Sequence, residues 1–168
     1  MKVLVKDANI IIDLIEIDLI DEFFRLDYDV ITSDFVRNEI TDEMQSSKIE
    51  KYILLGKLAV KLLEGEELFE LLRLKSKYSA LSIQDCSVVY LVKRENGILL
   101  SGDRTARFAA KEQGTEYHGI LWVFDRLLES KIITYNVAIA KMELLMEINN
   151  WLPAEECEKR IRKWKSIK

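Results

Sequence analysis

The sequence predicts an α/β fold: a single domain of three layers, α/β/α, with a central, mostly parallel sheet and a helical C-terminal tail. Short runs rich in Val, Ile and Leu alternate with longer amphipathic stretches, as expected for buried parallel strands joined by helices. The chain of 168 residues is long enough for one substantial core. It has a single proline and no linker-like or repetitive segment. We therefore expect a main domain at 1–130 and a helical extension at 131–168 packed on it.

In the first half of the chain, each expected element has a local signal. The expected elements are strands at 2–6, 28–33 and 57–63 and helices at 8–16, 19–25, 34–40 and 66–75. The strands are short and rich in β-branched residues, whereas the helices carry apolar residues at helical spacing. Ser33 and Asp34 are both good N-caps for the helix that follows the second strand.

The second half continues the alternation. The expected elements are helices at 82–92, 103–111, 119–129, 137–148 and 154–164 and strands at 98–100 and 116–117. Ser82 and Asp85 have the spacing of a capping box, with Asp in place of the usual Glu. Gly97 and Gly114 end helices, and Pro153 is well placed at a helix start.

Composition narrows the class of protein. The chain is 49% hydrophobic and 32% charged, which suits a folded protein, and its net charge of −4 gives no overall attraction to nucleic acid. Contact with phosphates would need a local basic patch or a bound cation. Charges in the apolar N-terminal segment break any signal-peptide or membrane-spanning pattern. We expect Cys86 and Cys157 to be reduced core thiols, and we expect a cytoplasmic protein without membrane contact.

Carboxylates stand at comparable places in this pattern. Asp7 directly follows the first strand, and Asp103 follows the 98–100 strand after a Ser-Gly turn. Glu39 lies on the helix after the second strand, and Asp85 lies in the first turn of the helix before the Asp103 strand. Parallel strands end at one edge of a sheet, so Asp7 and Asp103 should emerge together if their strands are neighbours. The helix-borne acids would then point into the same cleft.

Acids at close quarters repel one another and stay ionised only when cations neutralise them. Carboxylate oxygens favour Mg²⁺ or Mn²⁺. One or two such ions activate a water and stabilise in-line attack on a phosphodiester, which is the chemistry of a metal-dependent nuclease. Taken singly, each acid also has a plain structural interpretation. Asp7, Asp85 and Asp103 are plausible helix caps, and Glu39 is a plausible solvated surface acid.

The order and spacing of three segments resemble the PIN-domain family. The segments are VLVKDANIIIDLIEIDLIDEFF, VITSDFVRNEI and LSIQDCSVVYLVKRENGILLSGDRTARFAAKEQG, followed by HGILWVFDRLLESKII. The resemblance implies a PIN-like domain over 1–130 and a Mg²⁺- or Mn²⁺-dependent ribonuclease. It also implies a homodimer, and for many bacterial members a toxin controlled by an antitoxin protein.

The resemblance implies roles for individual residues. Asp7, Glu39, Asp85 and Asp103 match the catalytic, metal-binding acids of the family. Ser101 falls where the family has a small hydroxyl residue, and Asn9 falls at a polar position two residues after the first acid. Ala8 stands where the family commonly has Thr, a departure that bears on substrate or metal positioning.

Arg104 and Arg107 share one broad helix face after Asp103 and would bind the RNA backbone, although a solvated face with ion pairs is the alternative. Two other functions stay open. One is a binding module with an inactive acidic site, which Ala8 favours. The other is a different phosphoryl-transfer enzyme using the same acids.

The remaining candidates favour structural roles. His118 is the only histidine, and without a His/Cys cluster we expect no zinc site. The tryptophans Trp122, Trp151 and Trp164 are interpreted as packing residues, with base stacking as the alternative. The basic C-terminal end is interpreted as a solvated helical face, and a patch for RNA or an acidic partner is the alternative.

Overall fold

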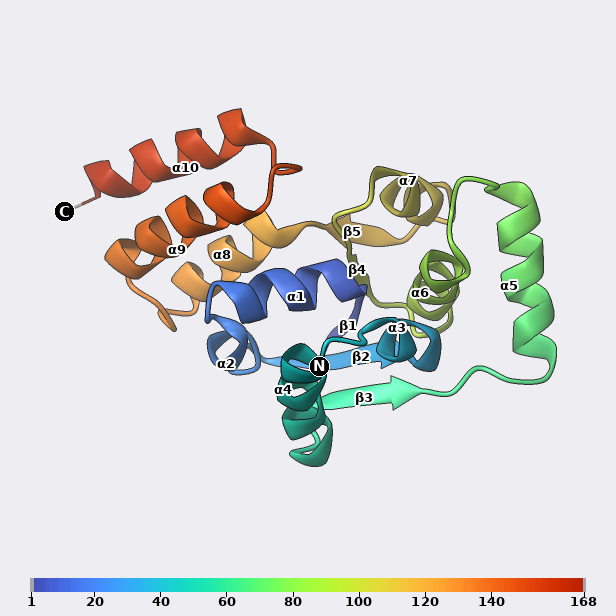
Figure 1. Ribbon diagram of the computed structural model, residues 1–168. Coiled ribbons are helices and arrows are strands. Elements are labelled where there is room, and N and C mark those ends of the chain that lie inside the picture. The colour runs from blue at the N-terminus through green and yellow to red at the C-terminus, as the bar shows by residue number, and fades with distance from the viewer. Residues whose placement is uncertain (1, 168) are drawn as a thin grey trace.

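A five-stranded parallel sheet forms the centre of the computed structural model, which describes residues 2–167 (Figure 1). Its strands are β1 (Lys2–Lys6), β2 (Tyr28–Ser33), β3 (Leu58–Lys61), β4 (Ile98–Leu100) and β5 (Glu116–His118). They are ordered β3-β2-β1-β4-β5, and all four pairings are parallel. The expected α/β fold is confirmed, and the sheet positions the carboxyl ends of β1 and β4 side by side.

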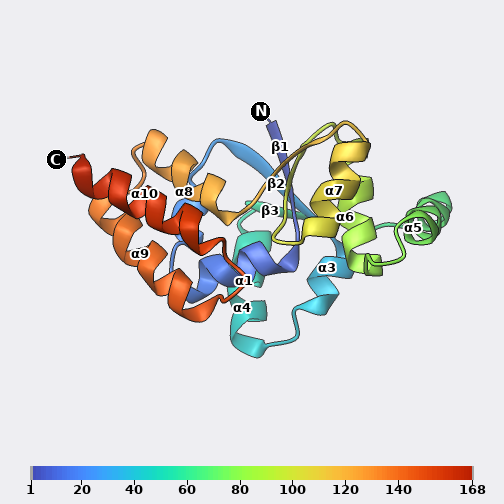
Figure 2. The same cartoon turned by 90° about the horizontal axis from the view of Figure 1, so that it is seen from above.

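Helices join the strands and extend beyond the last one. They are α1 (Ala8–Glu16), α2 (Ile20–Phe23), α3 (Asp34–Glu39), α4 (Glu43–Leu54), α5 (Glu66–Lys77), α6 (Ile83–Arg94), α7 (Arg104–Glu112), α8 (Ile120–Glu129), α9 (Tyr135–Ile148) and α10 (Ala154–Ser166). Because parallel crossovers are right-handed, α1 and α4 lie on one face of the sheet and α6 and α7 on the other (Figure 2).

Two elements differ from the sequence expectation. Helix α2 is only one turn long, because the chain leaves the helix at Phe24 instead of continuing to Arg25. Helix α4 was not expected at all. It buries only Ile49 and Tyr52, so its sequence has too few apolar positions to give a clear helical period.

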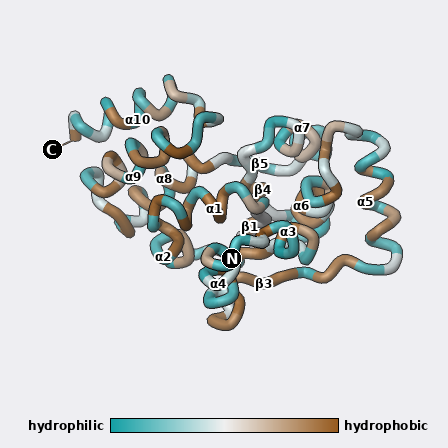
Figure 3. Tube along the Cα trace, in the orientation of Figure 1, coloured by the Kyte–Doolittle hydropathy of each residue, from teal (hydrophilic) through white to brown (hydrophobic). Residues whose placement is uncertain are grey.

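The core is contiguous and lies between the sheet and its covering helices. Among the core residues that are fully buried are Leu4, Leu14, Val88, Leu99 and Phe124. Both cysteines are buried and free, as expected. Helix α5 lies at the periphery of the molecule and carries hydrophobic residues (Figure 3). One of them, Phe69, is exposed.

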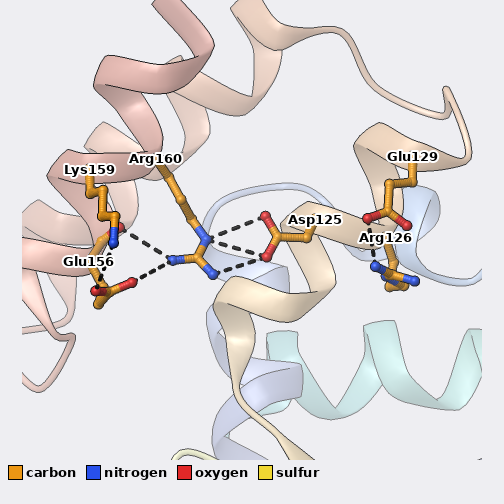
Figure 4. A network of polar contacts seen from close by, with 6 residues as sticks. All are labelled: Asp125, Arg126, Glu129, Glu156, Lys159 and Arg160. Carbon is orange, nitrogen blue, oxygen red and sulfur yellow. Dashed lines mark hydrogen bonds and ion pairs between the residues drawn. The ribbon is translucent and has the colours of Figure 1, made fainter.

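The C-terminal helices pack against one another and against α1. Arg160 on α10 donates from Nη2 to Asp125 on α8 at 3.0 Å and from Nη1 to Glu156 at 3.1 Å (Figure 4). The Trp164 ring stacks on Phe124, with centroids 6.1 Å apart. The extension is therefore tied to the domain, while a boundary at 130 remains a prediction. In residues 2–167 no helix is long and apolar enough to cross a membrane.

The basic end of the chain mostly forms ion pairs, which supports the interpretation as a solvated face. Arg162 pairs with Glu158 at 3.3 Å and Lys165 with Glu143 at 3.0 Å. Lys168, the last of these basic residues, lies outside the described residues.

Candidate functional site

The candidate site lies at the carboxyl edge of β1 and β4. These strands are neighbours, with Lys6 opposite Leu100, so the residues that follow each strand meet at the same edge. The backbone N–H of Asp7 donates to the carbonyl of Leu100 at 3.1 Å, which extends the ladder by one step. The first acid and the Ser-Gly turn are therefore fixed against each other by the sheet itself.

Asp7 is the most buried acid of this edge. Its side chain is 5% exposed, and Oδ1 accepts a hydrogen bond from the Ile10 N–H at 3.2 Å, which caps α1. Burial raises the pKa of Asp7 to about 6, against the lowering effect of hydrogen bonds from Ser101 and from backbone N–H groups. The nearby charge of Asp85 raises that pKa further. The ionised carboxylate of Asp7 is thus destabilised at this position, and a nearby positive charge would stabilise it.

Ser101 connects Asp7 to Asp103. Its buried hydroxyl donates to Asp7 Oδ2 and accepts the backbone N–H of Asp103 at 3.0 Å. Its own N–H donates to the carbonyl of His118 on β5 at 3.0 Å. The Ser101 hydroxyl therefore links the Asp7 carboxylate to the Asp103 backbone, and the Ser101 N–H ties this turn to β5.

Asp103 caps the next helix. Its Oδ1 accepts the Ala106 N–H at 2.7 Å, and the side chain is half-buried. A carboxylate oxygen has two lone pairs, so a cap bond leaves acceptor capacity for a cation. The structural interpretation of Asp103 as a cap and the functional one are therefore compatible.

Asp85 lies at the start of α6, and its Oδ2 accepts both the backbone N–H of Ser82 at 2.9 Å and its hydroxyl at 2.6 Å. The capping box expected from the sequence is complete. Helix α6 is tied to the carboxyl end of β2 because the hydroxyls of Ser33 and Ser87 lie 2.6 Å apart. This contact places the first turn of α6 at the same edge as Asp7, consistent with the effect of Asp85 on the pKa of Asp7.

Glu39 is placed differently. It is the last residue of α3 and is exposed, and within residues 2–167 no hydrogen bond or ion pair joins it to the other three acids. In the same part of the chain, no three His, Cys, Asp or Glu groups are arranged as a ready metal site. The strand and helix ends thus bring Asp7, Asp85 and Asp103 to one edge of the sheet, whereas the place of Glu39 in the site stays a prediction.

The candidate substrate-binding residues surround this edge. Arg107 lies over the turn, donating from Nε to the Asp103 carbonyl at 3.3 Å and from Nη2 to the Gly102 carbonyl at 3.4 Å. Among the described residues no carboxylate pairs with its guanidinium. Arg104 and Asn9 are both exposed, on the first turns of α7 and α1. Arg107 is therefore the cation best positioned to meet a phosphate here.

The backbone of Gly102 is a contributor that the sequence did not reveal. Its N–H bonds the Asp7 carboxylate and lowers the pKa of that group. Such a contact comes from the backbone and depends on the turn conformation, so the residue type at this position does not encode it.

A cavity of about 820 Å³ lies elsewhere, at the amino ends of β2 and β3. Its lining includes Phe24, Tyr28, Tyr52 and Lys57. None of the candidate acids lines it, so the cavity and the acidic edge are separate features of the molecule.

A family model described as PIN domain matches residues 3–166 of the chain. Among solved structures, PAE2754 from Pyrobaculum aerophilum is 19% identical, covers 77% of this chain and 98% of its own, and superposes with a TM-score of 0.54. VapBC2 from Rickettsia felis, bound to a DNA fragment from their promoter, is 13% identical over 70% of this chain and 98% of its own, with a TM-score of 0.51. Among curated proteins, none matches the chain. At such low identities the solved structures establish a common fold.

Proposed function

The chain belongs to the PIN-domain family, and from this premise we propose that it is a metal-dependent ribonuclease that hydrolyses RNA phosphodiesters. Asp7, Glu39, Asp85 and Asp103 would hold Mg²⁺ or Mn²⁺. The observation that carries the proposal is the buried Asp7 carboxyl, whose pKa is raised beside Asp85 and which has no cationic side chain bonded to it in the described residues.

The donor set fits a hard divalent cation. Carboxylate oxygens are its preferred ligands, and a buried acid next to a second acid is stabilised in its charged form by such an ion. When bound, the cation supplies charge neutralisation and activates water for attack on phosphorus. Asp7 would supply a carboxylate held by a helix cap and by the Ser101 hydroxyl, and Asp103 a carboxylate held by a helix cap, with its backbone N–H bonded to Ser101.

The chain's own residues would do the positioning. Arg107, held by two backbone carbonyls, binds a phosphate of the RNA strand and orients it toward the acids. Arg104 and Asn9 contact the strand on either side. Glu39 is exposed at the end of α3, whereas Asp7 is buried, so we expect a smaller loss from removal of Glu39 than from removal of Asp7.

Partners are part of the proposal. The family resemblance of the sequence supports an antitoxin protein and a homodimer.

Mn²⁺-dependent cleavage of single-stranded RNA by the wild type and by Asp103→Asn tests this function. Asn is a good N-cap, so the variant should fold normally while losing one carboxylate charge. Asp42 offers a matched control, because its Oδ1 caps α4 by accepting the Gln45 N–H at 2.9 Å and it is not among the proposed metal ligands. We expect Asp103→Asn to abolish cleavage and Asp42→Asn to retain it. Undiminished cleavage by Asp103→Asn removes the proposal.

A binding module with an unused acidic site is the second candidate. Ala8, at a position where the family commonly has Thr, and the exposed Glu39 favour it. Side-by-side assays on RNA, DNA flaps and small phosphate esters separate these possibilities. Activity on none of them, together with no Mn²⁺ binding at millimolar concentration, favours the module, whereas turnover of phosphate esters alone favours another phosphoryl-transfer enzyme.

A further inference from the structure

Trp151 is the most exposed large hydrophobic residue of the described chain. It lies between α9 and α10, and 96% of it is accessible. The other two tryptophans pack, since Trp164 is 4% exposed and Trp122 stacks on the His118 ring with centroids 4.7 Å apart. The sequence interpretation of Trp151 as a packing residue is therefore wrong.

The connection that carries Trp151 is fixed to the domain. Its backbone N–H donates to Asn149 Oδ1 at 3.0 Å, and Asn149 Nδ2 donates to both carboxylate oxygens of Asp13 at 3.1 and 3.0 Å. Asp13 is on α1, the helix that Asp7 caps. The indole is thus displayed to solvent from a backbone position held by the helix of the candidate site.

The direction of the chain brings Trp151 toward that site. Lys141 pairs with Asp18 at 3.9 Å, beyond the C-terminal end of α1, whereas Asn149 contacts Asp13 in its middle. From Lys141 to Asn149 the chain therefore runs along α1 toward the N-terminus of that helix, which Asp7 caps. Both views place the α9–α10 connection over α1 (Figures 1 and 2). Six residues of helix separate Asp13 from Asp7, which is about 9 Å along the axis.

The chemistry around the indole suits a nucleic acid base. The connection Asn149–Ala154 contains no charged residue of its own, and the exposed acids Glu147 and Glu155 flank it. Asn150 and Asn9 are exposed amides, each offering a donor and an acceptor to a base edge. Aromatic faces with neighbouring amides are the usual means by which proteins bind single-stranded RNA.

We infer that Trp151 stacks on an unpaired base of an RNA strand whose phosphodiester lies at Asp7 and Asp103. This inference rests on the proposed ribonuclease function and adds to it a residue, outside the acidic edge, that binds an unpaired base of the substrate. A duplex would keep its bases stacked on one another and would not offer a free face to the indole.

A protein partner is the competing occupant of this surface. Ile148, one turn before the connection and 47% exposed, would contribute to such a contact. The neighbouring Asn150 amide and the course of the chain along α1 toward Asp7 favour the base. Loss of a dimer on removal of the indole, with RNA affinity unchanged, would instead establish the protein contact.

The test measures binding of a short single-stranded RNA in the Asp103→Asn background, where the strand stays uncut, by anisotropy of a labelled RNA and by tryptophan fluorescence. Trp151→Ala and Trp151→Phe are compared, with Phe69→Ala as the control for loss of an exposed aromatic on α5 (65% exposed). Light scattering of each variant reports the oligomeric state.

We expect RNA to quench the fluorescence of the parent, and Trp151→Phe to lose most of this quenching while keeping affinity within a few fold. Trp151→Ala should bind roughly tenfold more weakly or worse, and Phe69→Ala should bind like the parent. Equal affinity of Trp151→Ala and the parent, or binding by the parent without quenching, overturns the inference. Cleavage assays on the wild type decide the proposed function separately, because RNA that quenches without being cut upholds the stacking and refutes the nuclease.

Discussion

The Ser101 hydroxyl donates a hydrogen bond to the Asp7 carboxylate, although 94 positions separate the two residues along the chain. The same oxygen accepts the backbone N–H of Asp103 at 3.0 Å. A single buried hydroxyl therefore links the carboxylate of one candidate ligand to the backbone of another. Its removal tests how far the arrangement of these acids governs activity.

We predict that Ser101→Ala lowers RNA cleavage by about 10- to 100-fold, the usual effect of losing a group that orients metal ligands. The substitution leaves the buried Asp7 carboxyl without one donor, so the free energy of unfolding should also fall by about 1–3 kcal/mol. Steady-state cleavage and urea denaturation measure the two effects.

Thr115→Val is the control, because Thr115 is half-buried, its hydroxyl donates to the Ala110 carbonyl at 2.8 Å, and it precedes β5 at the edge of the sheet opposite the acids. We expect it to lose stability but to keep most of its activity. Wild-type cleavage by Ser101→Ala would show that Ser101 has no positioning role.

The position of Arg107 predicts a phosphate contact. If its guanidinium binds one RNA phosphate, Arg107→Ala should weaken binding for all RNA sequences and reduce the slope of log affinity against log salt by about 1. Arg104→Ala tests the exposed neighbour in the same way. Arg162→Ala serves as the control, since Arg162 pairs with Glu158 on α10. An unchanged salt slope in Arg107→Ala would place this side chain outside the RNA contact.

The α8–α10 ion pair predicts a stability difference between two arginines. Arg160 binds Asp125 through Nε and Nη2 with a half-buried side chain, whereas the Arg162 side chain is 68% exposed. We expect Arg160→Ala to lower the free energy of unfolding by about 1 kcal/mol, and Arg162→Ala by less than about 0.5 kcal/mol. Urea denaturation of both variants measures this. Equal losses in the two variants would mean that the Arg160–Asp125 pair between α8 and α10 adds no more stability than the exposed Arg162–Glu158 pair.

Asp13 predicts a pH dependence. Burial raises its pKa to about 6, the Asn149 hydrogen bond lowers it, and the charge of Glu16 raises it. In the unfolded chain this pKa is about 4. Between these values the folded state binds more protons, so stability from this group increases as the pH falls from 6 to 4.

Asp13→Asn cannot titrate and keeps one acceptor for Asn149. As the pH falls from 6 to 4, the wild type should therefore gain stability relative to this variant. The expected gain in unfolding free energy is about 1 kcal/mol after allowance for solvent screening. Denaturation at several pH values without added metal measures it. A difference that is independent of pH would contradict the raised pKa of Asp13.

The sequence predicted the elements that have strong local signals. Strand β4 was expected at its observed bounds because its three residues are all apolar and lie between Gly97 and the Ser-Gly turn. The capping box of Ser82 and Asp85 was predictable because it depends on spacing alone. Helix α4 was missed because it is mostly exposed and has a weak apolar period.

The candidate site was predictable only in part. Asp7 and Asp103 meet because each directly follows a strand, and neighbouring parallel strands end at one edge. Glu39 is placed by the length and packing of α3, which residue types do not encode, and its side chain is exposed. The exposure of Trp151 likewise depends on how the α9–α10 connection meets α1 through Asn149 and Asp13.

Diffraction from crystals soaked in Mn²⁺, measured at an energy where manganese scatters anomalously, is the most direct test of the proposed metal site. An anomalous peak within coordination distance of the Asp7 and Asp103 carboxylates is expected, and it should disappear in Asp7→Asn. Ordered carboxylates without such a peak at millimolar Mn²⁺, or a peak only elsewhere in the molecule, would contradict a shared cation at this edge of the sheet.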